Sequence, residues 1–153
     1  QFSRRENNQR VFTASNNVKA AAIVCYEVVF NRIIYEAARN GAQAFFVILN
    51  EGWYDAAKVP QQFLQFSTIR AIETRRSIAH SSNLGISAFI NQRGDVIDKT
   101  ESKSAGFLKQ EMKMNRKITF VARMGNYIEI VALLAVIYFT ISSLFSFFKK
   151  KLI

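Results

Sequence analysis

Residues 19–27 read KAAAIVCYE, and this stretch decides the class of the fold. Its first six residues form a short apolar run that is typical of a buried strand, and the run ends at Cys25. A second run, AFFVIL, occupies Ala44–Leu49. Between the two runs, residues 31–40 carry apolar side chains at helical spacing, and Gly41 follows as a helix stop. Strand, helix and strand in this order predict an α/β domain.

Beyond this unit the chain alternates further between helical and strand patterns and ends in a β-rich part. The residues QRGD at 92–95 separate two apolar stretches, which indicates a hairpin with glycine in its turn. A helix with Ile72 among its inward-facing residues precedes the hairpin. In chain order we predict a loop over 50–60, a helix over 61–79, a tight loop over 81–85, hairpin strands over 86–91 and 96–100, and weaker strands near 106–112 and 117–122.

The first strand has the composition of a central strand, so we expect neighbouring strands to precede it. Residues 1–18, however, begin with a polar, asparagine-rich stretch, and we predict a loop or linker there. The chain also begins with Gln1 rather than with methionine. We therefore expect a processed, trimmed or partial form of something longer.

The composition narrows the classes of protein to which the chain can belong. Its 153 residues amount to one domain, and half of them are hydrophobic, which provides for a core and excludes a disordered chain. One cysteine and one histidine exclude a disulfide framework and a Cys/His zinc site. The net charge of +10 favours an acidic partner such as an anionic membrane. Nucleic acid is not expected, because the basic residues form no stripe interleaved with aromatic residues.

The C-terminal part of the sequence predicts a membrane helix. Residues 130–148 read IVALLAVIYFTISSLFSFF, and at 1.5 Å per residue they would span about 28 Å, close to the thickness of a bilayer core. With Tyr127 as an interfacial aromatic, we predict a transmembrane helix over 127–148. The lysines at 149–151 then mark 149–153 as a cytoplasmic basic tail, which places the body of the chain in the bacterial periplasm. A buried core helix is the alternative.

Cys25 is the candidate nucleophile from its position alone. It follows a buried strand at the edge where α/β folds hold ligands and nucleophiles, and a helix N-terminus nearby would favour the thiolate form. The backbone N–H of Tyr26 would then point toward the oxyanion of a tetrahedral intermediate, with Glu27 close by. The alternative is a small buried hydrophobe without chemistry. The single histidine, His80, is interpreted as a helix-end residue with no catalytic role.

Two blocks of sequence resemble signatures of a known family. VCYE at 24–27 and NEGWY at 50–54 are similar to the CYE and N-D-A-W-F signatures of the apolipoprotein N-acyltransferase family. These are bacterial membrane enzymes with a nitrilase-like domain of the carbon-nitrogen hydrolase superfamily. Three further blocks resemble the family's patterns in the same order, so that the resemblance covers about residues 12–148. They are QFSTIRAIE at 65–73, SNLGIS at 82–87 and ARMGNY at 122–127.

The resemblance implies a fold and an activity. The fold would be the second half of a nitrilase-like α-β-β-α sandwich over residues 19–122, followed by the one transmembrane helix. The activity would be transfer of an acyl chain from a phospholipid onto the cysteine as a thioester, and then onto the N-terminal amine of a diacylglyceryl-cysteine apolipoprotein. The implied partners are the phospholipid donor, the apolipoprotein acceptor and the bacterial inner membrane. No metal or dissociable cofactor is implied.

The resemblance also assigns roles to individual residues. It implies that Cys25 is the nucleophile, that Tyr26 lends its backbone N–H to the oxyanion, and that Glu27 supports the site. Trp53 and Tyr54 would lie near the lipid entrance, where aromatic side chains can contact acyl chains, with packing into the core as the alternative. Residues expected to serve as structure near the site are Asn50, Asn83, Gly85 and, as a pair three positions apart on a helix, Arg70 and Glu73.

Departures from the family pattern limit what the chain can do by itself. The family's catalytic Glu and Lys precede the cysteine, and neither Glu6 nor Lys19 matches their motifs. Glu51 and Tyr127 stand where the family usually has Asp and Trp, which are mild changes. A thiolate without its base and its oxyanion lysine loses most of its rate advantage. We therefore expect the chain to be inactive alone.

Two other functions stay open. A membrane-anchored, nitrilase-like amidase or hydrolase would use the same chemistry but would release a free acid instead of passing the acyl group to an amine. A non-catalytic, membrane-anchored remnant would be indifferent to Cys25→Ala. The ordered blocks and the predicted membrane helix favour the acyltransferase.

Overall fold

The computed structural model describes residues 11–52, 58–125 and 127–151, with residues 144–151 described by their backbone alone. The chain divides into two compact units, Gln1–Arg123 and Met124–Ile153. The first unit holds a β-sheet and the helices around it. The second consists almost entirely of one long helix.

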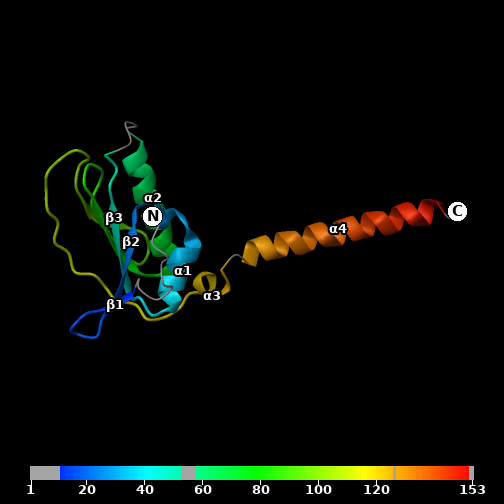
Figure 1. Cartoon of the computed structure of the whole chain (residues 1–153), viewed down its shortest axis with the longest axis horizontal. Coiled ribbons are helices and arrows are strands. Elements are labelled where there is room, and N and C mark those ends of the chain that lie inside the picture. The colour runs from blue at the N-terminus through cyan, green and yellow to red at the C-terminus, as the bar shows by residue number, and fades with distance from the viewer. Residues whose placement is uncertain (1–10, 53–57, 126, 152–153) are drawn as a thin grey trace, which may run out of the picture. The chain divides into compact units, whose positions relative to one another are not determined.

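One mixed sheet of six strands, which lie side by side in chain order, forms the frame of the first unit (Figure 1). Its three central strands β2, β3 and β4 are parallel, so their carboxyl ends meet at one edge of the sheet. The outer strands β1, β5 and β6 are antiparallel to their neighbours. The strands are β1 (Val11–Thr13), β2 (Lys19–Val24), β3 (Ala44–Leu49), β4 (Ser77–Ser82), β5 (Ala88–Ile90) and β6 (Val96–Lys99).

Helices cover one face of this sheet. Along β3, Phe45 and Val47 are fully buried in the core that also contains Ile34 of the first α-helix, whereas Phe46 and Ile48 are 44% and 51% exposed. Because successive strand residues point to opposite faces, the described residues leave the second face largely open. The helices of this unit are the 3₁₀ helix η1 (Cys25–Val29), α1 (Asn31–Arg39), α2 (Val59–Thr74) and the short α3 (Phe120–Met124), all but the last residue of which belongs to it.

A long stretch without regular secondary structure, residues 100–119, is tied to the sheet by buried polar side chains. Arg76 is fully buried and donates hydrogen bonds to several backbone carbonyl groups, including that of Lys117 at 3.3 Å. Burial lowers the pKa of its guanidinium from the usual value, and the carbonyl oxygens compensate the buried charge. Ser77 Oγ donates to the Lys113 carbonyl at 2.9 Å. Polar contacts such as these therefore hold the stretch to the core.

The end of the second α-helix differs from the prediction. α2 ends at Thr74 rather than at 79, because Arg75 adopts a left-handed backbone with φ +54° and the chain then turns into β4. β4 pairs with β3 and buries Ile78, so pairing within the sheet overrides the helical pattern there. Ile72, expected to face inward, is 42% exposed. The inward face of the helix was therefore partly misassigned.

The two strands that decide the fold form with their predicted bounds, as β2 and β3. The predicted hairpin is confirmed by antiparallel β5 and β6, with Gly94 at φ +90° in the turn between them. The strands predicted near 106–112 and 117–122 do not form, because the first range is irregular and the second leads into α3. A short strand, β1, forms instead within the residues predicted as a loop or linker, and it pairs with β2.

The second unit contains α4, Tyr127–Lys151, which forms over the range predicted as a membrane helix. Large apolar side chains such as those of Ile130, Leu133 and Leu134 are exposed along its described part. Within the part of the chain that the structure describes, no helix combines the length and apolarity needed to cross a membrane. The transmembrane prediction for 127–148 is therefore not supported.

Candidate active site

Cys25 lies at the junction between β2 and η1, where the parallel strands end. It is the first residue of the 3₁₀ helix and a partly buried free thiol. Its backbone φ of +52° is in the left-handed region, which costs about 1 kcal/mol or more for a residue with a side chain. Strain of this kind concentrates at functional sites, so the conformation marks Cys25 as a functional candidate.

The carboxylate of Glu27 closes the cysteine turn from its N-terminal side. Glu27 is largely buried, and its Oε2 accepts a hydrogen bond from the backbone N–H of Val24 at 2.9 Å. Such a contact, from the third helical residue back to the residue before the helix, satisfies an N–H group that a helix start leaves unpaired. It spans Cys25 and fixes the backbone on either side of it.

The ring of Tyr26 attaches the turn to α2. It is half-exposed and meets Phe63 edge to face, with the ring centroids 5.6 Å apart. A contact of this geometry contributes about 0.5–1.5 kcal/mol beyond the burial of area. The sequence predicted a role only for the backbone N–H of Tyr26, and the contact made by its ring was not predicted.

Arg70 attaches the turn to α2 at a second point. Its Nε donates to the carbonyl oxygen of Val28 and its Nη2 to that of Val29, each at 2.9 Å. Its Nη1 pairs with Glu73, which confirms the predicted ion pair. The two carbonyl contacts were not predicted. They place the guanidinium at the C-terminal end of η1, opposite the contact made by Glu27.

Glu73 is itself held by α1. Tyr35 of that helix lies beside Glu73, and burial together with the Glu73 carboxylate raises the pKa of the Tyr35 hydroxyl to about 12. The phenol therefore stays protonated at neutral pH beside the carboxylate. Tyr35 of α1 therefore lies beside the Arg70–Glu73 pair, and Arg70 continues from that pair to the cysteine turn.

A second cluster of polar groups joins the loops that follow β3 and β4. Asn83 Nδ2 donates to Asn50 Oδ1 at 2.7 Å, and the Glu51 N–H donates to Asn83 Oδ1 at 3.1 Å. Ser82 Oγ donates to Glu51 Oε2 at 2.6 Å, and the Gly85 N–H donates to Ser82 Oγ at 2.8 Å. A β-carbon at Gly85 would lie 1.3 Å from the buried carboxylate, so this position requires glycine for space.

The parallel strands bring both clusters to the same edge of the sheet. Cys25 follows β2, the loop with Asn50 follows β3, and the loop with Asn83 follows β4. The structure therefore places these predicted residues at the ends of three neighbouring strands. Trp53 and Tyr54, which the resemblance placed at the lipid entrance, lie outside the described residues.

His80 is not the helix-end residue that the sequence predicted. It lies in β4, is almost fully buried, and has its Nδ1 2.7 Å from Ser67 Oγ of α2. Burial lowers the pKa of the imidazole to about 4, so the ring is neutral at physiological pH. Its burial and its contact with Ser67 of α2 identify His80 as a residue of the core. Across the described ranges, no group of three or more His, Cys, Asp or Glu side chains is placed to hold a metal ion.

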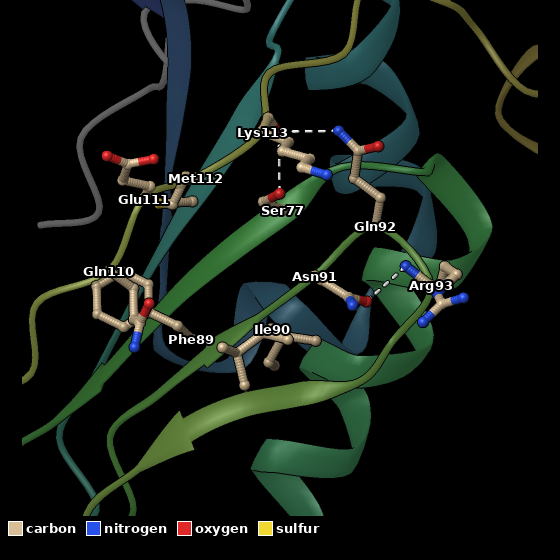
Figure 2. A pocket seen from close by; sticks show the side chains of 11 residues that line it. Ser77, Phe89, Ile90, Asn91, Gln92, Arg93, Gln110, Glu111, Met112 and Lys113 are labelled. Atoms are coloured by element: carbon tan, nitrogen blue, oxygen red, sulfur yellow. Dashed lines mark hydrogen bonds between the residues drawn. The ribbon is translucent and has the colours of Figure 1, made fainter.

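A cavity of about 590 Å³ lies between the β5–β6 hairpin and residues 110–113. Figure 2 shows Ser77 and Gln92 reaching the backbone of Lys113, whose carbonyl oxygen accepts a hydrogen bond from each. The lining of this cavity contains none of the predicted site residues. The candidate site therefore depends on the backbone geometry and the polar clusters at the strand ends, and not on the size of a cavity.

Known proteins resemble this chain over most of its length. Residues 2–118 match the family model described as carbon-nitrogen hydrolase. Three curated relatives, from Bdellovibrio bacteriovorus, Chlorobaculum tepidum and Mycolicibacterium smegmatis, are each named apolipoprotein N-acyltransferase. They are 32%, 30% and 31% identical to the chain over 80%, 76% and 80% of it. The chain spans 23%, 22% and 21% of their own lengths.

Solved structures share the fold. Nit3 of Saccharomyces cerevisiae, a member of branch 10 of the nitrilase superfamily, matches 67% of this chain and 40% of its own, with a TM-score of 0.57 and 17% identity. An amidase from Nesterenkonia sp. matches 63% of this chain and 38% of its own, with a TM-score of 0.50 and 23% identity. At such identities the likeness concerns the fold alone, which is a nitrilase-like α/β arrangement with a mixed sheet.

Proposed function

Because this chain belongs to the carbon-nitrogen hydrolase family, we propose that it forms the cysteine-bearing part of an apolipoprotein N-acyltransferase. The curated relatives carry that name, and the chain has five sequence blocks that resemble the family's patterns in the same order. The chain spans less than a quarter of the length of these relatives. The proposed activity is therefore that of a longer protein to which the chain contributes its cysteine.

The proposed reaction transfers an acyl chain in two covalent steps. The Cys25 thiolate attacks the ester carbonyl of a phospholipid, a C–S bond forms, the ester C–O bond breaks, and the lysophospholipid leaves as an alcohol after taking up a proton. The N-terminal amine of a diacylglyceryl-cysteine apolipoprotein then attacks the thioester. A C–N bond forms, the C–S bond breaks, and the amine loses a proton, which restores the thiolate and the proton donor.

The strained backbone at Cys25 carries this proposal. A left-handed cysteine at the carboxyl end of a parallel strand is held on one side by Glu27 and on the other by Arg70. These contacts support a nucleophile whose position is set before substrate binds, which is how an enzyme lowers the entropy cost of reaction. In the same proposal Tyr26 donates its backbone N–H to the oxyanion, and Glu27 supports the turn.

Supporting roles fall to the loops at the same edge. In this proposal Trp53 and Tyr54 contact lipid at the entrance, as aromatic side chains do at membrane interfaces. Asn50, Asn83 and Gly85 shape the loops beside the nucleophile. The hydrogen bonds between these loops and the close packing at Gly85 support that assignment.

The open face of the sheet supports the proposal that the chain is one half of a larger domain. Phe46 and Ile48 of β3 are exposed there, although apolar strand residues favour burial. In the α-β-β-α sandwich that the resemblance implies, a second sheet covers this face. In our proposal the segment that brings this sheet also carries the catalytic Glu and Lys. We therefore expect no transfer activity from the 153-residue chain alone.

A membrane location is part of the proposal. Both proposed substrates are lipids, α4 exposes large apolar side chains along its described part, and the lysines at 149–151 suit an anionic membrane surface. We propose that the second unit associates with the bacterial inner membrane and that the first unit acts on the periplasmic side.

The test uses the longer protein, purified in detergent, with a phospholipid labelled in its acyl chain and a synthetic diacylglyceryl-cysteine peptide. We expect label on the amine of the peptide and an acyl adduct on Cys25 by mass spectrometry. Cys25→Ala should lose both signals. The substitution Ser104→Ala, at an exposed residue, is the control and should lose neither.

Each alternative function gives a different result in this assay. Release of the label as free fatty acid, with no acylation of the peptide, would support an amidase-like hydrolase instead. Transfer that survives Cys25→Ala would rule out the cysteine as nucleophile. The absence of both transfer and release, in a folded protein, would support a non-catalytic remnant.

A further inference from the structure

We propose that Arg70 is a positioning residue that holds the Cys25 turn in its reactive geometry. Arg70 acts through the backbone of η1 and not through contact with substrate. This inference rests on the proposed function only in so far as Cys25 is taken as the nucleophile. The contacts of Arg70 with η1, which we call the Arg70 clamp, join α2 to the cysteine turn. Their effect on the turn can be measured without any substrate.

The Arg70 guanidinium binds the C-terminal end of the turn. Its Nε and Nη2 donate to the carbonyl oxygens of Val28 and Val29, both at 2.9 Å, from 42 and 41 positions away in the sequence. Carbonyl groups at the end of a short helix have no partner within it and need a donor from outside. The planar guanidinium presents these two N–H groups in a fixed geometry, so it sets both the distance and the direction of the two peptide units.

Arg70 is itself anchored at its third nitrogen. Nη1 pairs with Glu73 one turn further along α2. Arg70 is only 7% exposed, and a buried charge is stable only when its hydrogen-bonding groups are paired. The side chain therefore cannot turn toward water without leaving Glu73 and two carbonyl groups without their partner.

α2 meets the cysteine turn at two points. Phe63 packs edge-on against Tyr26, and Arg70 lies seven residues later, two helical turns along the same face of α2. The first contact is near the start of η1 and the second is at its end, so one rigid helix spans the whole turn. Glu27, which lies within η1 itself, adds a further contact by accepting a hydrogen bond from the backbone N–H of Val24, the residue before Cys25.

The turn between these contacts needs outside support. A five-residue 3₁₀ helix contains few hydrogen bonds, and Cys25 at φ +52° adds strain that an unrestrained chain would release. Release of that strain rotates the backbone and carries the sulfur with it. A displacement of about 1 Å at a reacting group can cost about 100-fold in rate. Clamping the end of the turn therefore affects the rate of reaction as well as stability.

The experiment compares Arg70→Lys with Arg93→Lys in the longer protein. Lysine keeps the charge but replaces the planar fork by a single nitrogen. Arg93 is the matched control, because it forms an exposed ion pair with Asp95. Hydrogen exchange, followed by peptide mass spectrometry, reports the backbone of residues 25–30. Acyl-transfer kinetics report kcat and the KM for phospholipid.

We expect Arg70→Lys to speed exchange in residues 25–30 by about 10-fold or more and to lower kcat by about 10-fold to 100-fold. The KM for phospholipid should stay within about two-fold of the parent value, because Arg70 does not contact substrate. Arg93→Lys should leave all three quantities unchanged. A folded Arg70→Lys protein with parental exchange, or with faster exchange but parental kcat, would overturn the proposal.

A second variant decides the question if Arg70→Lys does not fold. Glu73→Gln keeps the guanidinium fork and removes only the charge that anchors it, so we expect the same changes at smaller size. No change in exchange or kcat would overturn the proposal. Transfer that survives Cys25→Ala would instead defeat the proposed function, and the exchange data would still decide whether Arg70 clamps the turn.

Discussion

Gly85 sets the space that is available to the buried carboxylate of Glu51. A β-carbon at this position would lie 1.3 Å from Glu51 Oε2 and 2.6 Å from Ser82 Oγ, which is far closer than atoms can approach. Gly85→Ala should therefore push Glu51 off its hydrogen bond with Ser82 and lower the free energy of unfolding by about 2 kcal/mol. Equilibrium unfolding in urea measures this change.

Gly106→Ala is the matched control, because its β-carbon would meet only Thr100 Cγ2 at 3.5 Å, an ordinary contact. It should change the free energy of unfolding by less than about 0.5 kcal/mol. Glu51→Ala removes the atoms that clash, so the double variant with Gly85→Ala should lose less than the sum of the two single variants. Equal losses at Gly85 and Gly106 would contradict the predicted clash.

His80 makes the stability of the first unit depend on pH. Burial lowers the pKa of its imidazole from 6.5 to about 4. The unfolded chain therefore binds a proton near pH 6.5, whereas the folded chain does not do so until about pH 4. The contribution of His80 to the free energy of unfolding is therefore fully present above pH 6.5, and it is lost as the pH falls toward 4. Over this range the pKa shift corresponds to a decrease of about 3 kcal/mol in the free energy of unfolding.

Urea unfolding at neutral and mildly acidic pH measures this loss, with His80→Asn for comparison. Asparagine keeps a polar group near Ser67 Oγ but does not titrate, so the difference in pH slope between the two proteins belongs to the histidine. Carboxylates that titrate in the same range affect both proteins equally. Parallel slopes would show that folding does not shift the protonation of His80.

Residues within contiguous motifs could be placed from the sequence. Cys25 and Asn50 directly follow apolar runs, and the motif of Asn83 resembles a known pattern, so their positions at strand ends were accessible. The contact of Arg70 with Val28 was not, because the acceptor is a backbone carbonyl group, which every residue has. The two residues are also 42 positions apart, and only the fold selects which carbonyl the arginine meets.

At the scale of elements, α2 ends in a conformation that favours glycine. Arg75 has φ +54° and ψ +43°, and its N–H donates to the carbonyl of Ala71. A residue with a β-carbon pays about 1 kcal/mol in this conformation, whereas glycine adopts it freely. Arg75→Gly should therefore raise the free energy of unfolding by up to about 1 kcal/mol, reduced by the greater freedom of glycine in the unfolded chain.

Asn40→Gly, at the end of α1, provides the comparison, because φ is −76° there and suits any residue. Glycine at this position gains nothing in the folded state and should lower stability by a fraction of a kcal/mol. Urea unfolding of both variants measures the contrast. A loss of stability at Arg75, or an equal gain at Asn40, would contradict the assignment of strain to the end of α2.

The predictability of the elements follows from how each is stabilised. β2 and β3 were predicted with correct bounds, because buried parallel strands are continuous apolar runs. The boundary between α2 and β4 was missed, since residues 71–79 carry no glycine or proline to end a helix, and pairing with β3 decides their structure. β1 has only three residues and forms a strand through its pairing with β2, so the sequence alone does not indicate it.

At the scale of the whole molecule, the second unit exposes apolar side chains along its helix, and we expect this helix to bind lipid. Its described residues expose large apolar side chains, and burial of such surface contributes about 25 cal/mol per Å². Each of the lysines at 149–151 adds about 1 kcal/mol of attraction near an anionic membrane. We expect the chain to float with phosphatidylglycerol vesicles in a density gradient. A shortened chain that ends at Arg123 should stay in the bottom fraction of the gradient.

Replacement of the lysines at 149–151 by glutamate separates the two contributions. Binding to anionic vesicles should fall, while binding to neutral vesicles, which depends on the apolar side chains, should stay the same. Equal flotation of the chain that ends at Arg123 would contradict the prediction. It would assign lipid binding to the first unit instead.

The contacts of Arg70 also set an order of events while the protein is being made. Val28 leaves the ribosome 42 residues before Arg70 does. At about 5–20 residues per second, the growing chain spends roughly two to eight seconds with its thiol in place but without the side chain that fixes the turn. In the proposed acyltransferase this order would disfavour premature acylation of the nascent polypeptide, because the Cys25 turn is held in place only after α2 has been translated.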